Sequence, residues 1–198
     1  MPNTETGSLA GLPILGFDDA SALEGWLTAE PRSSDGIWLR LAKKESAVKG
    51  VRKPEAIDAA LCHGWIDGQQ KPYDAESWLV RFTPRRRASR WSEINRARSL
   101  ELIAEGRMRP TGLAEVEAAQ ADGRWQAAYA PASTAQVPAD LQSALDANPE
   151  ASAFFATLTG ANRYAVLYRI QNVKRAETRA RKIAEFTAML ARNETIYS

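Results

Sequence analysis

The sequence has few of the residues that usually carry catalysis or hold metals. Its 198 residues include one cysteine, Cys62, and one histidine, His63. A single cysteine excludes an internal disulfide framework and a zinc ribbon, and a single histidine excludes a metal site built from several histidines. The glycine-rich patterns that bind dinucleotides and nucleoside triphosphates are missing as well. We therefore expect neither a metal nor a cofactor.

Long apolar runs are also missing. No stretch of about 18 apolar residues occurs, which argues against a membrane-spanning helix. The segment from Met1 to Gly7 has neither the basic nor the apolar region of a secretory signal, so the expected location is the cytoplasm. With 44% hydrophobic and 25% charged residues, the chain has the composition of a globular protein. Its length is enough for one large domain or for one domain with a helical appendage.

Charged residues are abundant but unevenly distributed, although the net charge is only +2. Residues 1–36 contain six acidic residues and one arginine, whereas residues 79–110 contain nine arginines and three acidic residues. Blocks of opposite sign can attract one another within the fold, or they can leave one basic face exposed. The sequence alone allows both.

The first half of the chain predicts a small sheet with helices. Residues 1–12 are expected to be a frayed tail. Helices are expected from Asp18 or Asp19 to Pro31 and from Pro54 to His63. Alternating apolar residues predict strands at 36–43, 65–72 and 78–83, although Asp67-Gly68 could instead form a tight hairpin turn.

The second half has a helical period. Helices are expected near residues 93–105, 111–121, 138–148, 150–159, 164–170 and 176–192. We predict an α+β fold, with a small antiparallel sheet near residues 37–83 and helices in the N-terminal half, followed by an all-helical C-terminal half. A shift in composition near residues 130–137 predicts two parts, an α+β domain at 1–130 and a helical subdomain at 131–198.

Arginine and tryptophan gather between residues 62 and 92. Guanidinium groups match the geometry of carboxylate and phosphate, and a helix N-terminus such as the one expected at Ser92 adds free amides. Indole rings could form a wall and order the arginines through cation–π contacts. We therefore predict a binding site for an anion, with these candidate residues: Trp65, Asp67, Trp78, Arg81, Arg85, Arg86, Arg90, Trp91 and Ser92.

Three other interpretations of these residues compete with an anion site. The arginines could pair with the acidic blocks at 1–36 and 111–162 and only support the fold. Residues 81–98 and 174–182 could bind nucleic acid, because basic stretches with interleaved aromatics are typical of single-strand binders. His63 and Asp67 could act as acid and base in an enzyme. Cys62 and His63 are consecutive on a helix and do not face each other, so a catalytic pair of the two is not expected.

Several short motifs resemble a known family. They are Ala60-Leu-Cys-His-Gly-Trp-Ile-Asp-Gly68, Arg81-Phe-Thr-Pro-Arg-Arg86, Trp91-Ser92 with Asn95, Gly106-Arg-Met108, Ala161-Asn-Arg-Tyr-Ala165 and Glu177-Thr-Arg-Ala-Arg181. Together they resemble the YdeI/OmpD-associated family, also called bacteriocin-protection proteins, over about Phe17 to Tyr197.

The resemblance implies a part in bacterial stress survival, including resistance to cationic antimicrobial peptides, and association with an outer-membrane porin. It brings no catalytic residues, and some descriptions of the family place it in the periplasm. We therefore expect a non-catalytic stress-response protein that binds an anionic small molecule or a protein partner, with nucleic acid as the alternative ligand, and that is a monomer or a homodimer.

Overall fold

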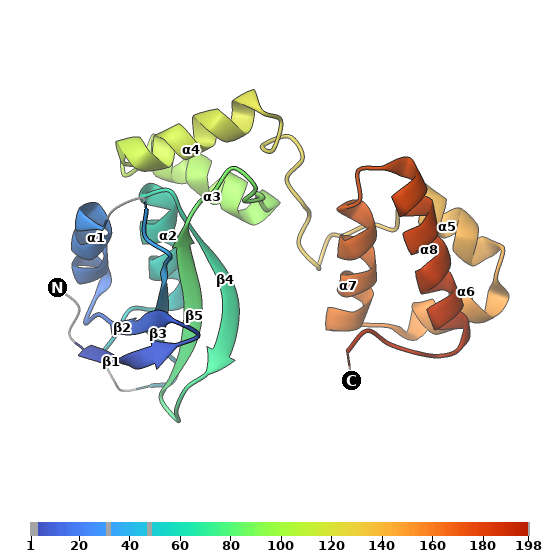
Figure 1. Cartoon of the computed structure of the whole chain (residues 1–198), viewed down its shortest axis with the longest axis horizontal. Helices are drawn as coiled ribbons and strands as arrows, with labels where there is room; N and C mark the ends of the chain where they lie inside the picture. Colours follow the sequence, from blue (N-terminus) through green and yellow to red (C-terminus); the bar gives the residue numbers. More distant parts are fainter. Residues whose placement is uncertain (1–3, 31–32, 47–48, 198) are drawn as a thin grey trace. The chain divides into compact units, whose positions relative to one another are not determined.

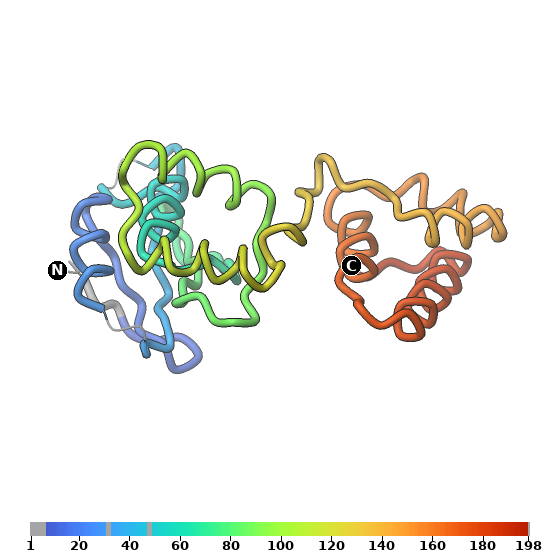
Figure 2. The backbone as a smooth tube through the Cα atoms, turned by 90° about the horizontal axis from the view of Figure 1, so that it is seen from above, coloured from blue at the N-terminus to red at the C-terminus, as the bar shows by residue number. Residues whose placement is uncertain are grey.

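The computed structural model describes residues 4–30, 33–46 and 49–197. The chain forms two compact units, Met1–Ala128 and Tyr129–Ser198, called here the N-terminal and the C-terminal unit. Figures 1 and 2 show the path of the chain through both. Each unit is described by itself.

The N-terminal unit contains one five-stranded sheet in the order β1-β2-β3-β5-β4. Its strands are β1 (Thr4–Leu9), β2 (Leu12–Gly16), β3 (Ile37–Ala42), β4 (Trp65–Pro72) and β5 (Ser77–Pro84). β2 and β3 are parallel, and the other neighbours are antiparallel. The sheet is therefore mixed, and the prediction of a purely antiparallel sheet was wrong. The reason is that a helix joins β2 to β3, which allows the chain to run in the same direction twice.

The β1–β2 hairpin also corrects the expectation of a frayed tail at residues 1–12, of which 1–3 lie outside the described residues. Its turn is Ala10-Gly11, with φ angles of 51° and 79°, and Leu9 pairs with Leu12. Positive φ at both turn residues is the conformation that a two-residue hairpin prefers. Ala at the first position gives no sequence signal for such a turn, because alanine rarely adopts positive φ.

Two helices cover one face of the sheet (Figure 1). In α1 (Ala20–Ala29), the Asp19 side chain caps the helix by accepting a hydrogen bond from the Ala22 amide at 2.8 Å. The predicted stop at Pro31 lies outside the described residues. α2 (Lys53–Cys62) has its proline in the first turn, as expected. The core between helices and sheet includes Leu23, Leu27, Leu39, Ala56 and Val80.

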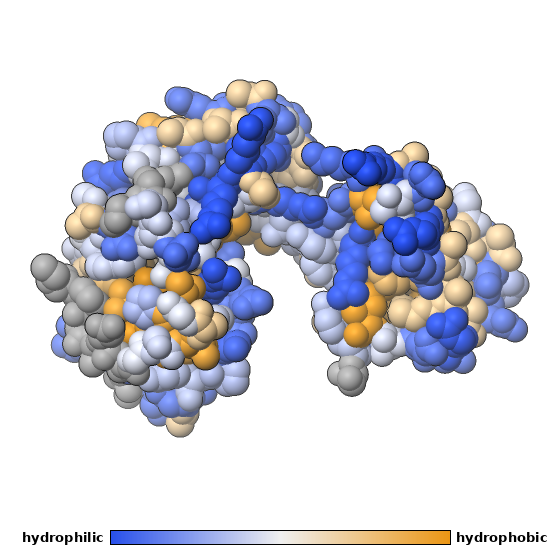
Figure 3. All heavy atoms as spheres, viewed as in Figure 1, coloured by the Kyte–Doolittle hydropathy of each residue, from blue (hydrophilic) through white to orange (hydrophobic). Residues whose placement is uncertain are grey.

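The opposite face of the sheet has its own apolar cluster around Trp38. The Trp38 indole donates a hydrogen bond to the Leu9 carbonyl at 2.9 Å, and Leu12, Ile14 and Leu79 surround the ring. Arg81 is the register partner of Trp38, so its side chain lies on this face and not under the helices. In Figure 3, apolar side chains among the strands are visible and hydrophilic ones border them.

Two further helices, α3 (Glu93–Ala104) and α4 (Pro110–Ala121), pack against α2 through a third apolar cluster. The start of α4 lies very close to the end of α2. The Arg109 amide donates to the Cys62 carbonyl at 3.0 Å, and a Cβ at Gly112 would lie 2.3 Å from the same oxygen. Glycine is therefore required at position 112 for the two helices to approach.

The C-terminal unit consists of α5 (Ala139–Asp146), α6 (Pro149–Thr157), α7 (Gly160–Gln171) and α8 (Ala176–Ala191). Their common core includes Leu141, Phe155, Val166, Ile170 and Phe186. The continuous series of helices begins with α3 at Glu93, which lies before the midpoint of the whole chain. The segment 122–138, which contains no helix, separates α4 from α5. The predicted all-helical half is thus not purely helical. Within the described ranges, no helix is long and apolar enough to cross a membrane.

Candidate functional site

Arg85, Trp91 and Ser92 lie together inside the N-terminal unit. Arg85 is only 3% exposed, and its guanidinium carbon lies 3.6 Å from the centre of the Trp91 ring. Its Nη1 donates to the Arg90 carbonyl at 3.1 Å, while Trp91 also packs against Trp125. The Ser92 hydroxyl oxygen accepts from the Asn95 amide and caps α3. Because these contacts are internal, this part of the predicted set supports the fold.

Arg81 and Arg86 line a hollow on the sheet face that carries Trp38. The hollow has a volume of about 320 Å³, and Gly68, Gln69 and Thr83 complete its lining. We call it the Arg81 hollow. None of these lining residues is acidic. Within the described part of the chain, Nε of Arg81 is buried and has no hydrogen-bond partner.

Arg86 is held more loosely than Arg81. Its Nη2 lies 3.3 Å from a carboxylate oxygen of Asp35, and the two side chains are 70% and 83% exposed. Such exposed pairs contribute about 0–1 kcal/mol, so Arg86 can exchange Asp35 for another anion at little cost.

Trp78, Asp67 and Arg90 lie apart from the Arg81 hollow. Trp78 lines a groove of about 510 Å³ together with Lys43, Lys44 and Lys71. Asp67 pairs in register with Phe82, which belongs to the core under the helices. Arg90 is exposed on the loop before α3. The structure therefore distributes the predicted site residues over several places.

Trp65 lines a separate pocket with His63, which we call the His63 pocket. Its volume is about 370 Å³. Nδ1 of His63 lies 2.9 Å from the Ala59 carbonyl oxygen, and Nε2 lies 3.1 Å from the Thr28 hydroxyl. Asp67 is not a partner of either nitrogen, so the structure lacks the direct contact that an acid–base pair of His63 and Asp67 would use.

Cys62 precedes His63 but has a different environment. The thiol is buried, and burial raises the pKa of Cys62 above its usual value. A buried thiol with a raised pKa stays protonated at neutral pH and is a poor nucleophile. This agrees with the expectation that Cys62 and His63 do not form a catalytic pair.

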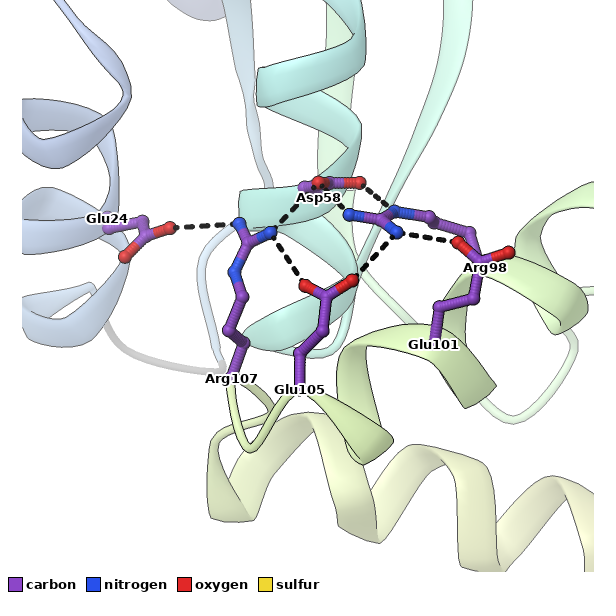
Figure 4. Close-up of polar contacts among 6 residues, drawn as sticks. All are labelled: Glu24, Asp58, Arg98, Glu101, Glu105 and Arg107. Carbon is purple, nitrogen blue, oxygen red and sulfur yellow. Dashed lines mark hydrogen bonds and ion pairs between the residues drawn. The ribbon is translucent and has the colours of Figure 1, made fainter.

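An ion network that the sequence analysis missed connects α1, α2 and α3 (Figure 4). At its centre, Asp58 of α2 accepts hydrogen bonds from Nε and Nη2 of Arg98 at 2.8 and 2.7 Å. Arg107 contacts Asp58 at 3.3 Å and Glu24 of α1 at 3.8 Å. The hydrogen bonds from Arg98 hold the pKa of Asp58 below its usual range. Arg98 and Arg107 thus pair internally, but mainly with acids outside the blocks 1–36 and 111–162 that the sequence offered as partners; Glu24 is the one member of the network from those blocks.

Comparison with known families gives two matches. A domain of unknown function (DUF8412) matches residues 15–115, which is just over half of the chain. The family described as bacteriocin-protection, YdeI or OmpD-associated matches residues 134–193. No curated protein and no solved structure matches the chain.

The second match confirms the resemblance that the sequence motifs indicated. Its range contains the two late blocks, 161–165 and 177–181. The earlier motifs, from Ala60 to Met108, fall in the range that the domain of unknown function matches. The resemblance expected along nearly the whole chain is therefore divided between two families.

Proposed function

We propose that this chain, which belongs to the DUF8412 family over residues 15–115 and carries a bacteriocin-protection, YdeI or OmpD-associated domain at residues 134–193, is a binding protein for a small anion. The proposed binding site is the Arg81 hollow. One observation carries the proposal: two guanidinium groups, an amide and a hydroxyl line the hollow, and none of its lining residues is acidic.

The state of the two arginines supports this function. Nε of Arg81 is buried without a hydrogen-bond partner in the described part of the chain, and leaving a buried donor unsatisfied costs about 1–3 kcal/mol. An anion that binds the Arg81 guanidinium in the hollow interacts with a side chain that is not fully satisfied within the protein. Arg86 can turn from its exposed partner Asp35 toward the same anion. Planar guanidinium groups bind carboxylate and phosphate through two parallel hydrogen bonds.

The volume limits the ligand to a small one. At about 320 Å³, the hollow lies at the lower end of the usual range for small-molecule sites, about 300–1,000 Å³. Phosphate, a phosphate monoester or a short dicarboxylate fits this volume. We propose no reaction at this site, because the hollow contains no nucleophile beside a base.

Calorimetric titration with inorganic phosphate and with succinate tests the proposal. The double variant R81Q/R86Q should weaken binding of at least one anion by about tenfold or more, since charge-assisted hydrogen bonds are lost. R181Q is the matched control, because the Arg181 side chain is 72% exposed and lies in the C-terminal unit. Absence of binding to the wild type, or equal loss in both variants, would refute an anion site at the hollow.

The family matched at residues 134–193 supports a protective role in bacteria. We propose that anion binding serves this role in a stress response. A strain that produces R81Q/R86Q should then survive a bacteriocin less well than one that produces the wild type. If the two strains survive equally although R81Q/R86Q no longer binds the anion, the anion site has no part in protection.

A second candidate function is single-stranded nucleic-acid binding at the Trp78 groove. Lys43, Lys44 and Lys71 line this groove. The Lys53 ammonium lies 5.3 Å from the centre of the Trp78 ring, whereas the Lys71 ammonium lies 5.7 Å from the centre of the Trp38 ring. An aromatic face with surrounding cations is the combination on which unpaired bases stack.

The two basic stretches that the sequence offered for nucleic acid, 81–98 and 174–182, contain arginines with internal partners. Arg98 is held by Asp58, Arg96 donates to the Trp125 carbonyl, and Arg179 is bound to Asp140. The test is titration of a fluorescent oligothymidine at several salt concentrations. Affinity should fall by about 0.7 log units per tenfold salt for each phosphate contacted, and W78A should weaken it. A flat salt dependence would exclude this function.

A further inference from the structure

We infer that the His63 pocket is a second binding site, independent of the Arg81 hollow, and that it takes a small monocarboxylate with an apolar body. The pocket lies where the end of α1, the end of α2, the start of β4 and the start of α4 meet. All of these elements belong to the N-terminal unit. Its volume of about 370 Å³ is within the usual range of small-molecule sites, about 300–1,000 Å³.

The inner wall of the pocket is apolar. Leu27 and Trp65 line it, and both are buried, Trp65 against the ring of Trp26. A ligand seated against this wall has apolar side chains as its neighbours. This favours a ligand with an apolar body over an inorganic ion.

Arg109 supplies a cation to the pocket. Its backbone amide is fixed by the hydrogen bond to the Cys62 carbonyl at 3.0 Å, which places the residue at the start of α4. Its guanidinium has no hydrogen bond or ion pair within the ranges the structure describes. An exposed arginine without an internal partner is available for a carboxylate.

His63 is a buried polar group on the same pocket. It is 4% exposed. Nδ1 faces the Ala59 carbonyl oxygen, which only accepts, so Nδ1 carries a proton. Nε2 faces the Thr28 hydroxyl, but that hydroxyl also lies 2.8 Å from the Glu24 carbonyl oxygen. Because the hydroxyl has one proton, it can donate that proton either to Nε2 of His63 or to the Glu24 carbonyl oxygen.

An anion in the pocket adds a partner for the guanidinium of Arg109. Glu30, which also lines the pocket, restricts the charge of that anion. A carboxylate at the rim repels a dianion more strongly than a monoanion. The combination of one arginine, one glutamate and an apolar wall therefore selects a monocarboxylate over phosphate.

The test uses His63 as its own reporter. Because it is the chain's only histidine, its imidazole ring gives one set of resonances in a carbon–proton correlation spectrum. Phenylacetate should shift these resonances in a saturable way, whereas the neutral isostere phenylacetamide should not. R109Q should weaken phenylacetate binding by about tenfold or more, from the loss of a charge-assisted contact.

Two matched variants make the outcome specific. R86Q, in the Arg81 hollow, should leave the phenylacetate shift unchanged, so the two sites can fail independently. E30Q should retain phenylacetate binding and allow phenylphosphonate to bind. The inference is overturned if phenylacetate leaves the His63 resonances in place, if phenylacetamide shifts them equally, or if R109Q binds phenylacetate as tightly as the wild type.

Discussion

Replacing Asp58 by asparagine should destabilise the N-terminal unit by about 2 kcal/mol at neutral pH. The change keeps the shape of the side chain but removes its charge, and the new amide nitrogen would face the guanidinium of Arg98. Asp58 is 17% exposed and Arg98 is 29% exposed, with 2.7 Å between them. Breaking one side of a partly buried pair leaves the other charge poorly solvated.

The magnitude follows from the bonds that are lost and those that stay. A hydrogen bond to a charged group contributes about 1.5–3 kcal/mol, and Asp58 accepts two from Arg98. Arg98 keeps Glu101 at 2.6 Å and Glu105 at 3.2 Å, so part of its interaction survives. The lower part of that range, about 2 kcal/mol, is therefore expected.

The effect should disappear in acid. Hydrogen bonds from Arg98 lower the pKa of Asp58 in the folded protein, so folding favours the ionised form. This contribution is fully present above the unfolded-state value, about 3.9, and is lost as the pH falls through the lower folded-state pKa. The difference in unfolding free energy between the wild type and D58N should thus be largest near pH 7 and shrink below about pH 4.

Urea unfolding followed by tryptophan fluorescence is the suitable assay. All six tryptophans lie in the N-terminal unit, so the signal reports this unit alone. D18N is the control, because it makes the same chemical change at an exposed position. A difference below about 0.5 kcal/mol at pH 7, as for ordinary surface substitutions, or one that persists unchanged in acid, would refute the reasoning.

Two more predictions use matched substitutions and the same assay. G112A should destabilise the N-terminal unit by several kcal/mol, because the new Cβ would lie 2.3 Å from the Cys62 carbonyl oxygen and must move a helix. G25A, in the middle of α1 with nothing within 4 Å of its Cβ, should stabilise the unit by about 0.5–1 kcal/mol. R85A should cost about 2 kcal/mol or more, because it removes a buried cation–π contact, while R86A should change stability by less than about 0.5 kcal/mol. A loss of stability in G25A, or equal losses in R85A and R86A, would contradict the packing described.

Helices were the part of the fold that local sequence signals predicted well. Asp19, Ser92 and Asn148 each accept a hydrogen bond from the first turn of a helix, and Pro149 stands at the start of α6. These signals lie within a few residues of the helix they start, so one sequence suffices to read them. α7 begins at Gly160, before the start expected near residue 164, because glycine is a poor helix former and gives no local signal for a first helical residue.

The sheet was predicted less well because its pairing is not local. The alternation of apolar and polar residues predicted β3, β4 and β5. The parallel direction of β2 beside β3 instead depends on the path that the chain takes through α1 between the two strands. Nothing within β2 itself encodes a parallel neighbour. The hairpin turn Ala10-Gly11 lacks the asparagine or aspartate that would have indicated it.

The candidate sites were also predicted only where their residues are close in sequence. Nearness in sequence brought Arg85 and Trp91 together, but the period of a strand separates Arg81 from its neighbour Phe82, which enters the core on the other face. Arg109 joins His63 in one pocket only because α4 starts against the end of α2, and no local pattern predicts that meeting.

The basic block at residues 79–110 illustrates why charge along a sequence is a poor map of charge on a surface. The guanidinium of Arg85 stacks on the ring of Trp91. Arg98 forms an ion pair with Asp58 of α2, and Arg107 forms one with Glu24 of α1. Among the cations whose internal partners are weak or missing in the described structure, Arg81 and Arg86 line one hollow and Arg109 lines another pocket. A search for ligands of this protein should therefore begin with these three residues, and the acidic partners of the other arginines explain why the whole block need not bind nucleic acid.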